Sequence, residues 1–512
     1  MSKLGWVAGL LLLVAVVPWQ SDVAEAEPNI CATRPNNTPR RIMDCVTVEG
    51  VREHQAALQA IADANGGTRF SGTPGYDASV DYVVEKLTAA GYEPEVQTFD
   101  YLAFTIDGPS ALEQVAPTPT TYEEGVDFGV IDQSDGGDVT APVTPVDLQL
   151  GPGNASTSGC EPEDYAGFPA GNVALLQRGA CTFEQKAETA AANGVAAIVI
   201  MNQGNSPDRE DIPPVTLTAN NTSGIPVLGV TYPLGVELSE ITGLEMRVFA
   251  NATREIKPTA NVIAETAGGR DDNVVVVGGH LDSVFEGPGI NDNGSGSAAI
   301  LEVAEQFANV TPFNKVRFSW WGAEESGSIG SEFYVTNLSE EELGNIALYL
   351  NFDMVGSPNY VRFVYDGDGS AFGLAGPDGS AAIENLFGTF YADRSLAFEP
   401  TQIDFRSDYE AFFLADIPFG GLFTGAEVPK TPEQVLVYGG TAGQQYDPCY
   451  HAVCDTFDNV SLEVLDLNSD AIGFAVVRYS KTTETVNGVR RGNPGGAAPA
   501  AVAEAAAVSG SA

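Results

Sequence analysis

Several runs of apolar residues in the second half of the chain end in a histidine or a carboxylate. In chain order, these runs lead to the polar side chains His280, Glu324, Glu325 and Asp353. Short continuous apolar runs are typical of strands buried on both faces of a parallel sheet. Because the loops at the carboxyl ends of such strands lie at one edge, the pattern predicts that these side chains come together there.

Strand-like and helix-like stretches alternate from about residue 261 onward. We expect strands near residues 261–266, 273–279, 315–321, 347–353, 361–365 and 419–423, and helices near 296–309, 327–336, 379–393, 407–414 and 461–479. This alternation predicts an α/β fold with a mixed, mainly parallel central sheet flanked by helices.

Two amphipathic helices are expected earlier in the chain, at about residues 51–64 and 75–90. An alternating strand follows from residue 92 to residue 101, whereas residues 27–48 have no regular pattern and are expected to be irregular. His54 lies on the first helix, where a packing or surface histidine is the expected role.

The composition of the chain changes between about residues 107 and 258, which are rich in Pro, Gly and Thr and in short runs typical of β-strands. Residues 171–202 are predicted to form a strand, a loop, a helix and a strand. The region has no histidine and no cluster of carboxylates on convergent loops, so it is assigned no chemistry. Its Arg-Gly-Ala-Cys-Thr-Phe phrase (178–183) resembles the protease-associated domain, a small α/β module inserted into several peptidase families.

That resemblance implies the domain organisation. The insert spans residues 106–256, and the catalytic domain is formed by residues 45–105 and 257–486. The implied role of the insert is substrate access or contact with a partner.

Both ends of the chain are predicted to lie outside these domains. The sequence predicts a secretory signal peptide over residues 1–26. Its basic residue is Lys3, its apolar run extends from Leu4 to Pro18, and its cleavage site is Ala24-Glu25-Ala26. The run is shorter than the roughly 20 residues that a membrane span needs. Residues 487–512 offer little apolar bulk and are predicted to be a disordered tail. We therefore expect a secreted protein, extracellular or periplasmic.

The composition excludes some classes of binding partner. The chain has 512 residues, enough for two or three domains, and its net charge is −45 from 24 basic and 69 acidic residues. So acidic a surface argues against nucleic acid or an anionic membrane as partner. We expect a monomer.

The cysteines suggest disulfide bonds, as expected for a secreted chain. Six cysteines allow 15 connectivities. The spacing favours Cys31 with Cys45, Cys160 with Cys181, and Cys449 with Cys454.

The polar residues at the predicted strand ends have the chemistry of metal ligands. The set is His280, Asp282, Asp292, Glu324, Glu325, Asp353 and, between two cysteines, His451. Each residue alone is more commonly a turn, cap or solvated residue, but their succession at consecutive strand ends is not explained in that way. Two histidines with several carboxylates are typical of a hydrolytic zinc site, and the surplus of carboxylates indicates two bridged ions.

Six phrases resemble the secreted two-zinc aminopeptidases of the aminopeptidase Y type, including the bacterial leucine-preferring enzymes. They begin at residues 278 (Gly-Gly-His-Leu-Asp-Ser-Val), 289 (Gly-Ile-Asn-Asp-Asn-Gly-Ser-Gly), 321 (Trp-Gly-Ala-Glu-Glu-Ser-Gly), 350 (Leu-Asn-Phe-Asp-Met), 421 (Gly-Leu-Phe-Thr-Gly-Ala) and 447 (Asp-Pro-Cys-Tyr-His-Ala-Val-Cys-Asp). The resemblance covers about residues 45–103 and 259–480. It implies removal of the N-terminal residue, with a preference for large apolar residues, from peptides and proteins that have a free N-terminus.

The resemblance also assigns metal ligands. His280 and Asp353 would bind one Zn²⁺, Glu325 and His451 would bind a second, and Asp292 would bridge the two ions. Each subunit would then hold two zinc ions. Calcium is a further implied ion, because Asp466 and Asp470 fall where some relatives bind it.

The remaining roles concern the reaction and the substrate. Glu324 would be the general base, Tyr450 would donate a hydrogen bond to the developing oxyanion, and Asp282 would orient His280. Met354 and Phe423 would form apolar walls of the side-chain pocket, and Arg406 would contact the substrate backbone. The relatives carry Gly at the position of Phe405 and can carry His at that of Tyr409, so Phe405 is expected to narrow the pocket.

Two other functions use the same sequence features. A carboxypeptidase or another amide hydrolase could carry the same zinc ligands, but a carboxypeptidase needs a cationic group for the substrate carboxylate, and Arg406 is the only obvious candidate. A catalytically inactive receptor or binding protein would be expected to lack ligands. All five ligand positions and the general base are filled here, which favours an enzyme.

Overall fold

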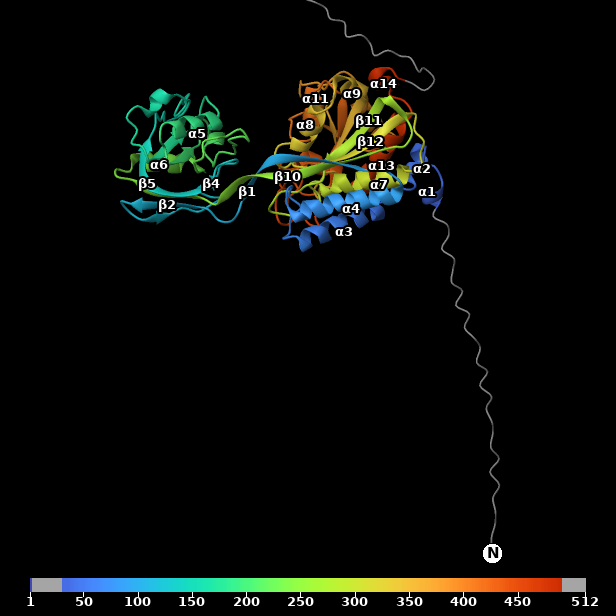
Figure 1. The fold of residues 1–512 in the computed structure, drawn as a ribbon, viewed down its shortest axis with the longest axis horizontal. Helices are drawn as coiled ribbons and strands as arrows, with labels where there is room; N and C mark the ends of the chain where they lie inside the picture. The colour runs from blue at the N-terminus through green and yellow to red at the C-terminus, as the bar shows by residue number, and fades with distance from the viewer. Residues whose placement is uncertain (2–29, 490–512) are drawn as a thin grey trace, which may run out of the picture.

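The computed structural model describes Met1 and residues 30–489, which form two lobes joined by a two-stranded ribbon (Figure 1). The ribbon consists of β1 (Glu95–Ile106) and β10 (Ala252–Glu265), which pair antiparallel along their length. The chain leaves the larger lobe along β1, forms the smaller lobe, and returns along β10. The sheets of both lobes are therefore connected through one pair of strands.

The larger lobe contains an eight-stranded sheet in the order β1-β10-β12-β11-β13-β16-β14-β15. Its other strands are β11 (Arg270–His280), β12 (Asn314–Trp321), β13 (Ile346–Phe352), β14 (Phe363–Tyr365), β15 (Glu399–Thr401) and β16 (Phe419–Phe423). Strands β12, β11, β13 and β16 are parallel neighbours, and β14 and β15 form a parallel pair. The predicted mixed, mainly parallel α/β sheet is confirmed.

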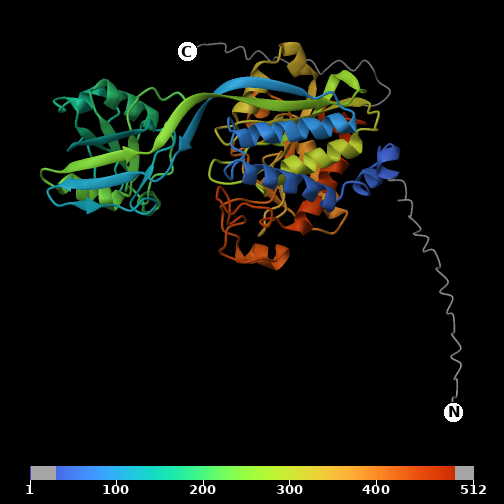
Figure 2. The same cartoon turned by 60° about the horizontal axis from the view of Figure 1, so that its bottom comes forward.

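Helices cover both faces of this sheet, as the continuous apolar strands require. On β11, Val275 and Val277 pack into one hydrophobic cluster, whereas Val274 and Val276 pack into another on the opposite face. The first face carries α3 (Val48–Ala64), α4 (Pro74–Ala90), α7 (Gly294–Phe307), α10 (Ser380–Ala392) and α13 (Leu462–Tyr479), of which α3, α4 and α7 lie side by side in Figure 2. The second carries α8 (Ile329–Thr336), α9 (Glu340–Asn345) and α11 (Tyr409–Leu414).

The smaller lobe contains a second eight-stranded sheet, in the order β3-β2-β9-β5-β6-β7-β8-β4. The strands are β2 (Ala111–Ala116), β3 (Thr120–Thr121), β4 (Phe128–Val130), β5 (Gly137–Pro145), β6 (Val173–Gln177), β7 (Ala197–Met201), β8 (Val227–Val230) and β9 (Glu245–Ala250), with helices α5 (Phe183–Ala192) and α6 (Tyr232–Glu240). The predicted succession of strand, loop, helix and strand corresponds to β6, α5 and β7, and β6 and β7 are parallel.

Some short elements were not predicted from the sequence. Residues 27–48, expected to be irregular, include the short helices α1 (Ile30–Thr33) and α2 (Pro39–Met43), of which α2 is capped by Thr38. Strand β15 and helices α9, α12 (Pro432–Tyr438) and α14 (Glu484–Asn487) were also missed. Each spans seven residues or fewer, which is too short for an apolar period to be evident.

The predictions for the two ends of the chain are only partly open to comparison. The signal peptide falls almost entirely outside the described residues, as does the tail from residue 490 onward. Residues 487–489, predicted to be disordered, are ordered: Asn487 ends α14 and its side-chain amide donates to Asn273. The tail prediction was therefore wrong for these three residues.

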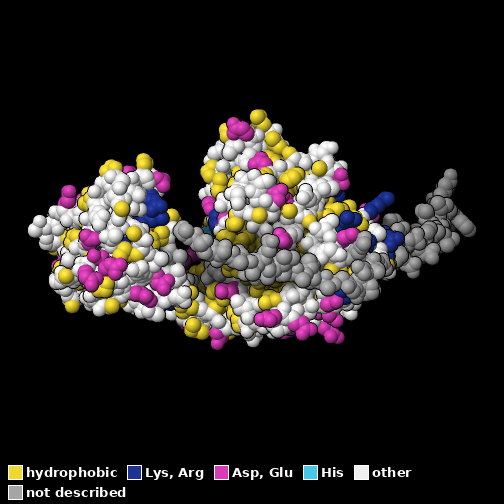
Figure 3. All heavy atoms as spheres, turned by 90° about the horizontal axis from the view of Figure 1, so that it is seen from above, with side chains coloured by type: hydrophobic (Ala, Val, Ile, Leu, Met, Phe, Trp, Pro, Cys, Tyr) yellow, Lys and Arg dark blue, Asp and Glu magenta, His cyan; other side chains and the backbone are white. Residues whose placement is uncertain are grey.

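Three disulfides occur in the described part of the chain: Cys31–Cys45, Cys160–Cys181 and Cys449–Cys454. They are the three pairs that the spacing favoured. None of the helices in the described residues is long and apolar enough to cross a bilayer. Acidic side chains are spread over both lobes in Figure 3, while basic ones are fewer, in keeping with the net charge of −45.

Candidate metal centre

Three parallel strands deliver polar side chains to one edge of the central sheet. Strand β11 lies between β12 and β13, so the carboxyl ends of all three strands are adjacent. His280 is the last residue of β11, Asp353 directly follows β13, and Glu324 and Glu325 come shortly after β12. The edge arrangement that the apolar pattern predicts is therefore present.

Asp292 reaches the same edge from the loop that precedes α7. The carboxylate of Asp455 accepts hydrogen bonds from the backbone N–H groups of Asn291 (2.9 Å) and Asp292 (3.0 Å). This contact fixes the backbone of the loop, and the Asp292 side chain, which is 7 % exposed, enters the site.

Asp292 lies between the two histidines of the site and directs a different oxygen to each. Its Oδ1 is 3.2 Å from Nε2 of His280, and its Oδ2 is 3.3 Å from Nε2 of His451. His280 Nε2 is also 3.2 Å from an oxygen of Asp353, and His451 Nε2 is 3.0 Å from an oxygen of Glu325. The five side chains thus form two donor sets that share the Asp292 carboxylate.

The close packing of these groups perturbs their protonation. Burial opposes protonation of His280, but the surrounding carboxylates, led by Asp353 and Glu324, together outweigh burial and raise the pKa of His280 well above its usual value. Burial and the nearby Asp292 raise the pKa of Glu325 to about 7. Burial likewise opposes protonation of His451, yet Glu325 and Asp292 together raise its pKa to about 11. Since ligands must lose these protons to bind a metal, metal binding at this site is expected to release protons.

The donors present fit zinc. Imidazole nitrogens and carboxylate oxygens are the ligands of hydrolytic zinc sites. His280, Asp292 and Glu325 each place a ligand atom within 4.8 Å of the others, and a buried oxygen of Glu325 has no hydrogen-bond partner in the described part of the chain. A bound cation would satisfy that oxygen, which otherwise carries a desolvation cost.

Asp282 contacts both His280 and the loop after β12. Its backbone carbonyl lies 3.2 Å from Nδ1 of His280, whereas its carboxylate is 3.6 Å away. The same carboxylate accepts a hydrogen bond of 3.2 Å from the backbone N–H of Glu324. Asp282 therefore links the His280 ring to the backbone of Glu324, the residue expected to be the general base.

Glu324 lines the pocket but lies farther from the histidines than Glu325 does. Its nearest approach to His280 Nε2 is 3.8 Å, and Ser328 donates a hydrogen bond of 3.4 Å to its other oxygen. Burial raises the pKa of Glu324 well above its usual value. The structure thus separates Glu324 from Glu325, which contacts His451 directly.

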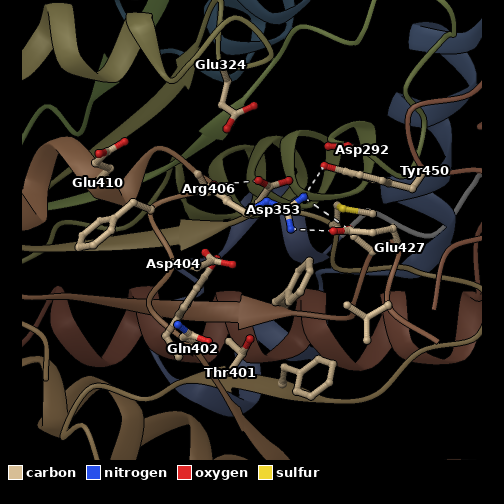
Figure 4. A pocket seen from close by; sticks show the side chains of 18 of the residues that line it. Asp292, Glu324, Asp353, Thr401, Gln402, Asp404, Arg406, Glu410, Glu427 and Tyr450 are labelled. Carbon is tan, nitrogen blue, oxygen red and sulfur yellow. Dashed lines mark hydrogen bonds and ion pairs between the residues drawn. The ribbon is translucent and has the colours of Figure 1, made fainter. Parts of the chain in front are cut away.

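A cavity of about 660 Å³ opens beside these residues (Figure 4). Met354, Phe423 and Arg406 all line it, as does Phe405, whose ring packs edge-on against Phe413. Tyr450 also lines the cavity, and its ring stacks on that of His451 at a centroid distance of 3.8 Å. The expected substrate-contacting residues therefore share one cavity with four of the five candidate ligands, all except His280.

Three residues that support the site were missed from the sequence: Asp455, Ser407 and Arg69. Ser407 donates a hydrogen bond of 2.8 Å to Asp353. Arg69 is fully buried and donates to the carbonyls of Pro288 (2.8 Å) and Gly289 (2.6 Å), just before Asp292. Asp455 is the last residue of the phrase that begins at residue 447, and Ser407 directly follows Arg406, whereas nothing in the sequence marks Arg69.

His54, the third histidine, lies apart from these residues. It is buried between helices, with Nδ1 2.8 Å from the hydroxyl of Tyr82 and Nε2 3.7 Å from both Glu302 and Glu305. It is thus a packing histidine in contact with carboxylates rather than part of the candidate metal centre.

Comparison with known proteins identifies the family. The chain matches Peptidase family M28 over residues 261–476 and the PA domain over residues 139–238. It is 53 % identical over 451 residues to an aminopeptidase of Pseudomonas aeruginosa, covering 88 % of this chain and 84 % of that one. It is 36 % identical over 499 residues to leucine aminopeptidase 2 of Trichophyton rubrum, covering 95 % and 96 %.

Solved structures agree with this assignment. The aminopeptidase of Aneurinibacillus sp. strain AM-1 superposes with a TM-score of 0.66 at 27 % identity, covering 86 % of this chain and 95 % of that one. A zinc aminopeptidase of Bacillus subtilis shares the fold, with a TM-score of 0.59 at 24 % identity over 88 % and 97 % of the two chains. The chain therefore belongs to peptidase family M28 and is a metalloaminopeptidase that carries a PA domain.

Proposed function

We propose that this protein is a secreted aminopeptidase that hydrolyses the first peptide bond of peptides and proteins with the help of two zinc ions. The main observation in support of this proposal is the position of Asp292. Its two oxygens lie 3.2 Å and 3.3 Å from two different histidines, each of which faces a further carboxylate. A carboxylate shared in this way would be able to bind two ions at once.

These contacts support the proposed ligand assignment. His280 and Asp353 would hold one zinc ion, Glu325 and His451 would hold the other, and Asp292 would contact both. Zinc bound there supplies a water of lowered pKa and a Lewis acid for the substrate carbonyl. Asp282 would keep the His280 ring oriented, since its carbonyl accepts from Nδ1.

Glu324 is proposed as the general base. It is buried, lines the cavity, and keeps a greater distance from the histidines than the ligand carboxylates do. A carboxylate in this position can accept the proton of the attacking water and pass it to the leaving amine. Tyr450 is proposed to donate its hydroxyl proton in a hydrogen bond to the developing oxyanion.

Recognition of a free α-amine is proposed to depend on acidic groups. Glu324 and Asp353 both line the cavity, so an ammonium group placed there finds carboxylates on two sides. The aromatic and apolar walls, including Met354 and Phe423, favour large apolar first residues. The name of the Trichophyton relative, a leucine aminopeptidase, agrees with this preference.

The alternative of a carboxypeptidase is disfavoured by the same cavity. A C-terminal carboxylate would need an available cation, and among the described residues that line the cavity Arg406 is the one Lys or Arg side chain. Its guanidinium is already paired with Glu427 at 2.8 Å. Three disulfides support an extracellular or periplasmic location, because disulfides persist in oxidising compartments.

The experiment that tests the proposed function compares free and blocked substrates. Leucine p-nitroanilide and its N-acetyl derivative differ only at the α-amine. We expect hydrolysis of the free amine and a loss of at least about 100-fold in kcat/KM on acetylation, since the ammonium loses its charge-assisted bonds. Equal cleavage of both compounds would show that the enzyme is not an aminopeptidase. A chelator is expected to abolish hydrolysis and added zinc to restore it, and activity that withstands chelation contradicts the role of the metal.

A calcium site is proposed separately, at Asp466 and Asp470 on α13. Burial and repulsion from Asp466 raise the pKa of Asp470 to about 7, and Asp44 adds further repulsion. Ca²⁺ prefers such oxygen ligands and would relieve the repulsion among the three carboxylates. We expect Ca²⁺ to raise the Tm of the zinc-loaded protein by about 2–4 °C, and Asp470→Asn to remove the increase. An equal increase in the variant would place any calcium effect elsewhere.

A further inference from the structure

Arg406 lies between an acidic side chain and the hydroxyl of Tyr450 at the mouth of the cavity (Figure 4). Its Nη1 donates to Oε1 of Glu427 at 2.8 Å, and its Nη2 lies 3.4 Å from Oε2 of the same carboxylate. Nη2 also donates to the Tyr450 hydroxyl oxygen at 3.1 Å. These hydrogen bonds connect three separate loops: the one before α11, the one after β16 and the Cys449–Cys454 segment.

The direction of the Arg406–Tyr450 bond matters for the chemistry. Arginine has no acceptor, so in this contact the Tyr450 oxygen must accept. A phenol that accepts from one partner still has its own O–H proton to donate to another. Arg406 therefore holds the Tyr450 oxygen in place and leaves its proton available to an oxygen of the substrate.

Glu427 determines whether Arg406 can do this. The Arg406 side chain is 52 % exposed and has several rotatable bonds, so it has many alternative rotamers in solvent. A carboxylate that meets both terminal nitrogens of the planar guanidinium restricts its position and its rotation. The Tyr450 ring is already held by stacking on His451, and the Glu427–Arg406 pair adds a constraint at the hydroxyl.

We propose that Glu427 is a positioning residue for the peptidase reaction: it fixes Arg406, and Arg406 fixes the Tyr450 hydroxyl toward the substrate carbonyl oxygen. The inference rests on the proposed role of Tyr450. Glu427 does not touch the reacting atoms in this arrangement. Its effect on turnover is transmitted through two hydrogen bonds, so it depends on the Tyr450 hydroxyl being present.

A double-mutant cycle tests this dependence. Tyr450→Phe is expected to lower kcat by about 100-fold, as loss of one oxyanion donor does. Glu427→Gln is expected to lower kcat by about 10-fold with KM within about two-fold, because a misplaced donor weakens only the transition state. In the Tyr450→Phe background, Glu427→Gln should change kcat by less than about two-fold. Glu427→Asp, which keeps the charge, should recover part of the loss.

Controls separate positioning from folding and from the wider function. Glu433→Gln makes the same chemical change on exposed α12, outside the cavity lining, and should leave kcat unchanged. All variants should bind the same amount of zinc and keep the same Tm, since exposed ion pairs contribute about 0–1 kcal/mol. A Glu427→Gln loss that persists in full without the Tyr450 hydroxyl, or that appears only in KM, overturns the inference while leaving the aminopeptidase assignment intact. No effect of Tyr450→Phe overturns both the inference and the role of Tyr450, and activity on free-amine substrates remains a separate measurement.

Discussion

Glu324→Gln is expected to lower kcat by about 10²–10⁴-fold while the protein keeps its zinc. Glutamine has nearly the shape of glutamate but cannot accept a proton from water at neutral pH. In the structure, Glu324 stays 3.8 Å from His280, and its neighbour Glu325 makes the close contact with His451. In the proposed assignment, the substitution therefore removes a proton acceptor rather than a ligand. Steady-state kinetics with a leucine substrate and metal analysis of the same preparation measure the two effects together.

Glu325→Gln is the matched control for this prediction, because it makes the same change one residue along. It should reduce bound zinc, since an amide oxygen is a poorer ligand than a carboxylate and the group lies 3.0 Å from His451. If the two variants behave in the opposite way, with Glu324→Gln losing metal, then the roles of the two residues are exchanged. Equal loss of metal in both would mean that Glu324 is also a ligand.

Asp292→Asn is expected to have the widest effect on metal content, because this residue contacts both donor sets. Asparagine keeps the shape of aspartate but loses its charge. Its side chain has one oxygen that can bind a cation, whereas its NH₂ group can only donate hydrogen bonds, so it cannot serve both donor sets. We expect the zinc content to fall well below two per chain and kcat to drop by at least about 100-fold. Metal analysis after dialysis against low zinc, followed by activity at saturating zinc, measures both consequences.

Asp282→Asn is the comparison for that experiment. Asp282 contacts His280 mainly through its backbone carbonyl, which the substitution preserves, so a smaller loss of metal affinity is expected, at most about 10–100-fold. A protein that retains two zinc ions after Asp292→Asn would show that the shared carboxylate does not bridge.

The parts of the fold that could be predicted from the sequence are those dominated by local pattern. The run Val274–Val277 has no polar face, so a strand buried on both sides was the natural expectation, and β11 contributes alternate residues to two different cores. The side chains at strand ends follow from the same logic. Residues such as His280 and Asp353 could be predicted because their partners are fixed by strand adjacency.

The supporting contacts could not be predicted in this way. Asp455 holds the backbone of Asp292, and Arg69 holds the carbonyls just before it, although both lie far from that loop in sequence. Such bonds depend on tertiary packing that no local period records. The hydrogen bond from Ser407 to Asp353 joins loops that follow different strands and has the same origin.

The ribbon of β1 and β10 also bears on how the protein folds. Ile106 pairs with Ala252, so the whole smaller lobe lies inside the loop that this pair closes. Closing so long a loop is entropically unfavourable for an unfolded chain, but a segment that has already collapsed brings its own ends together. Early folding of the smaller lobe would thus bring β1 and β10 together at the outer edge of the larger lobe's sheet. The insert would then assist the assembly of that sheet, independently of any contact with substrate.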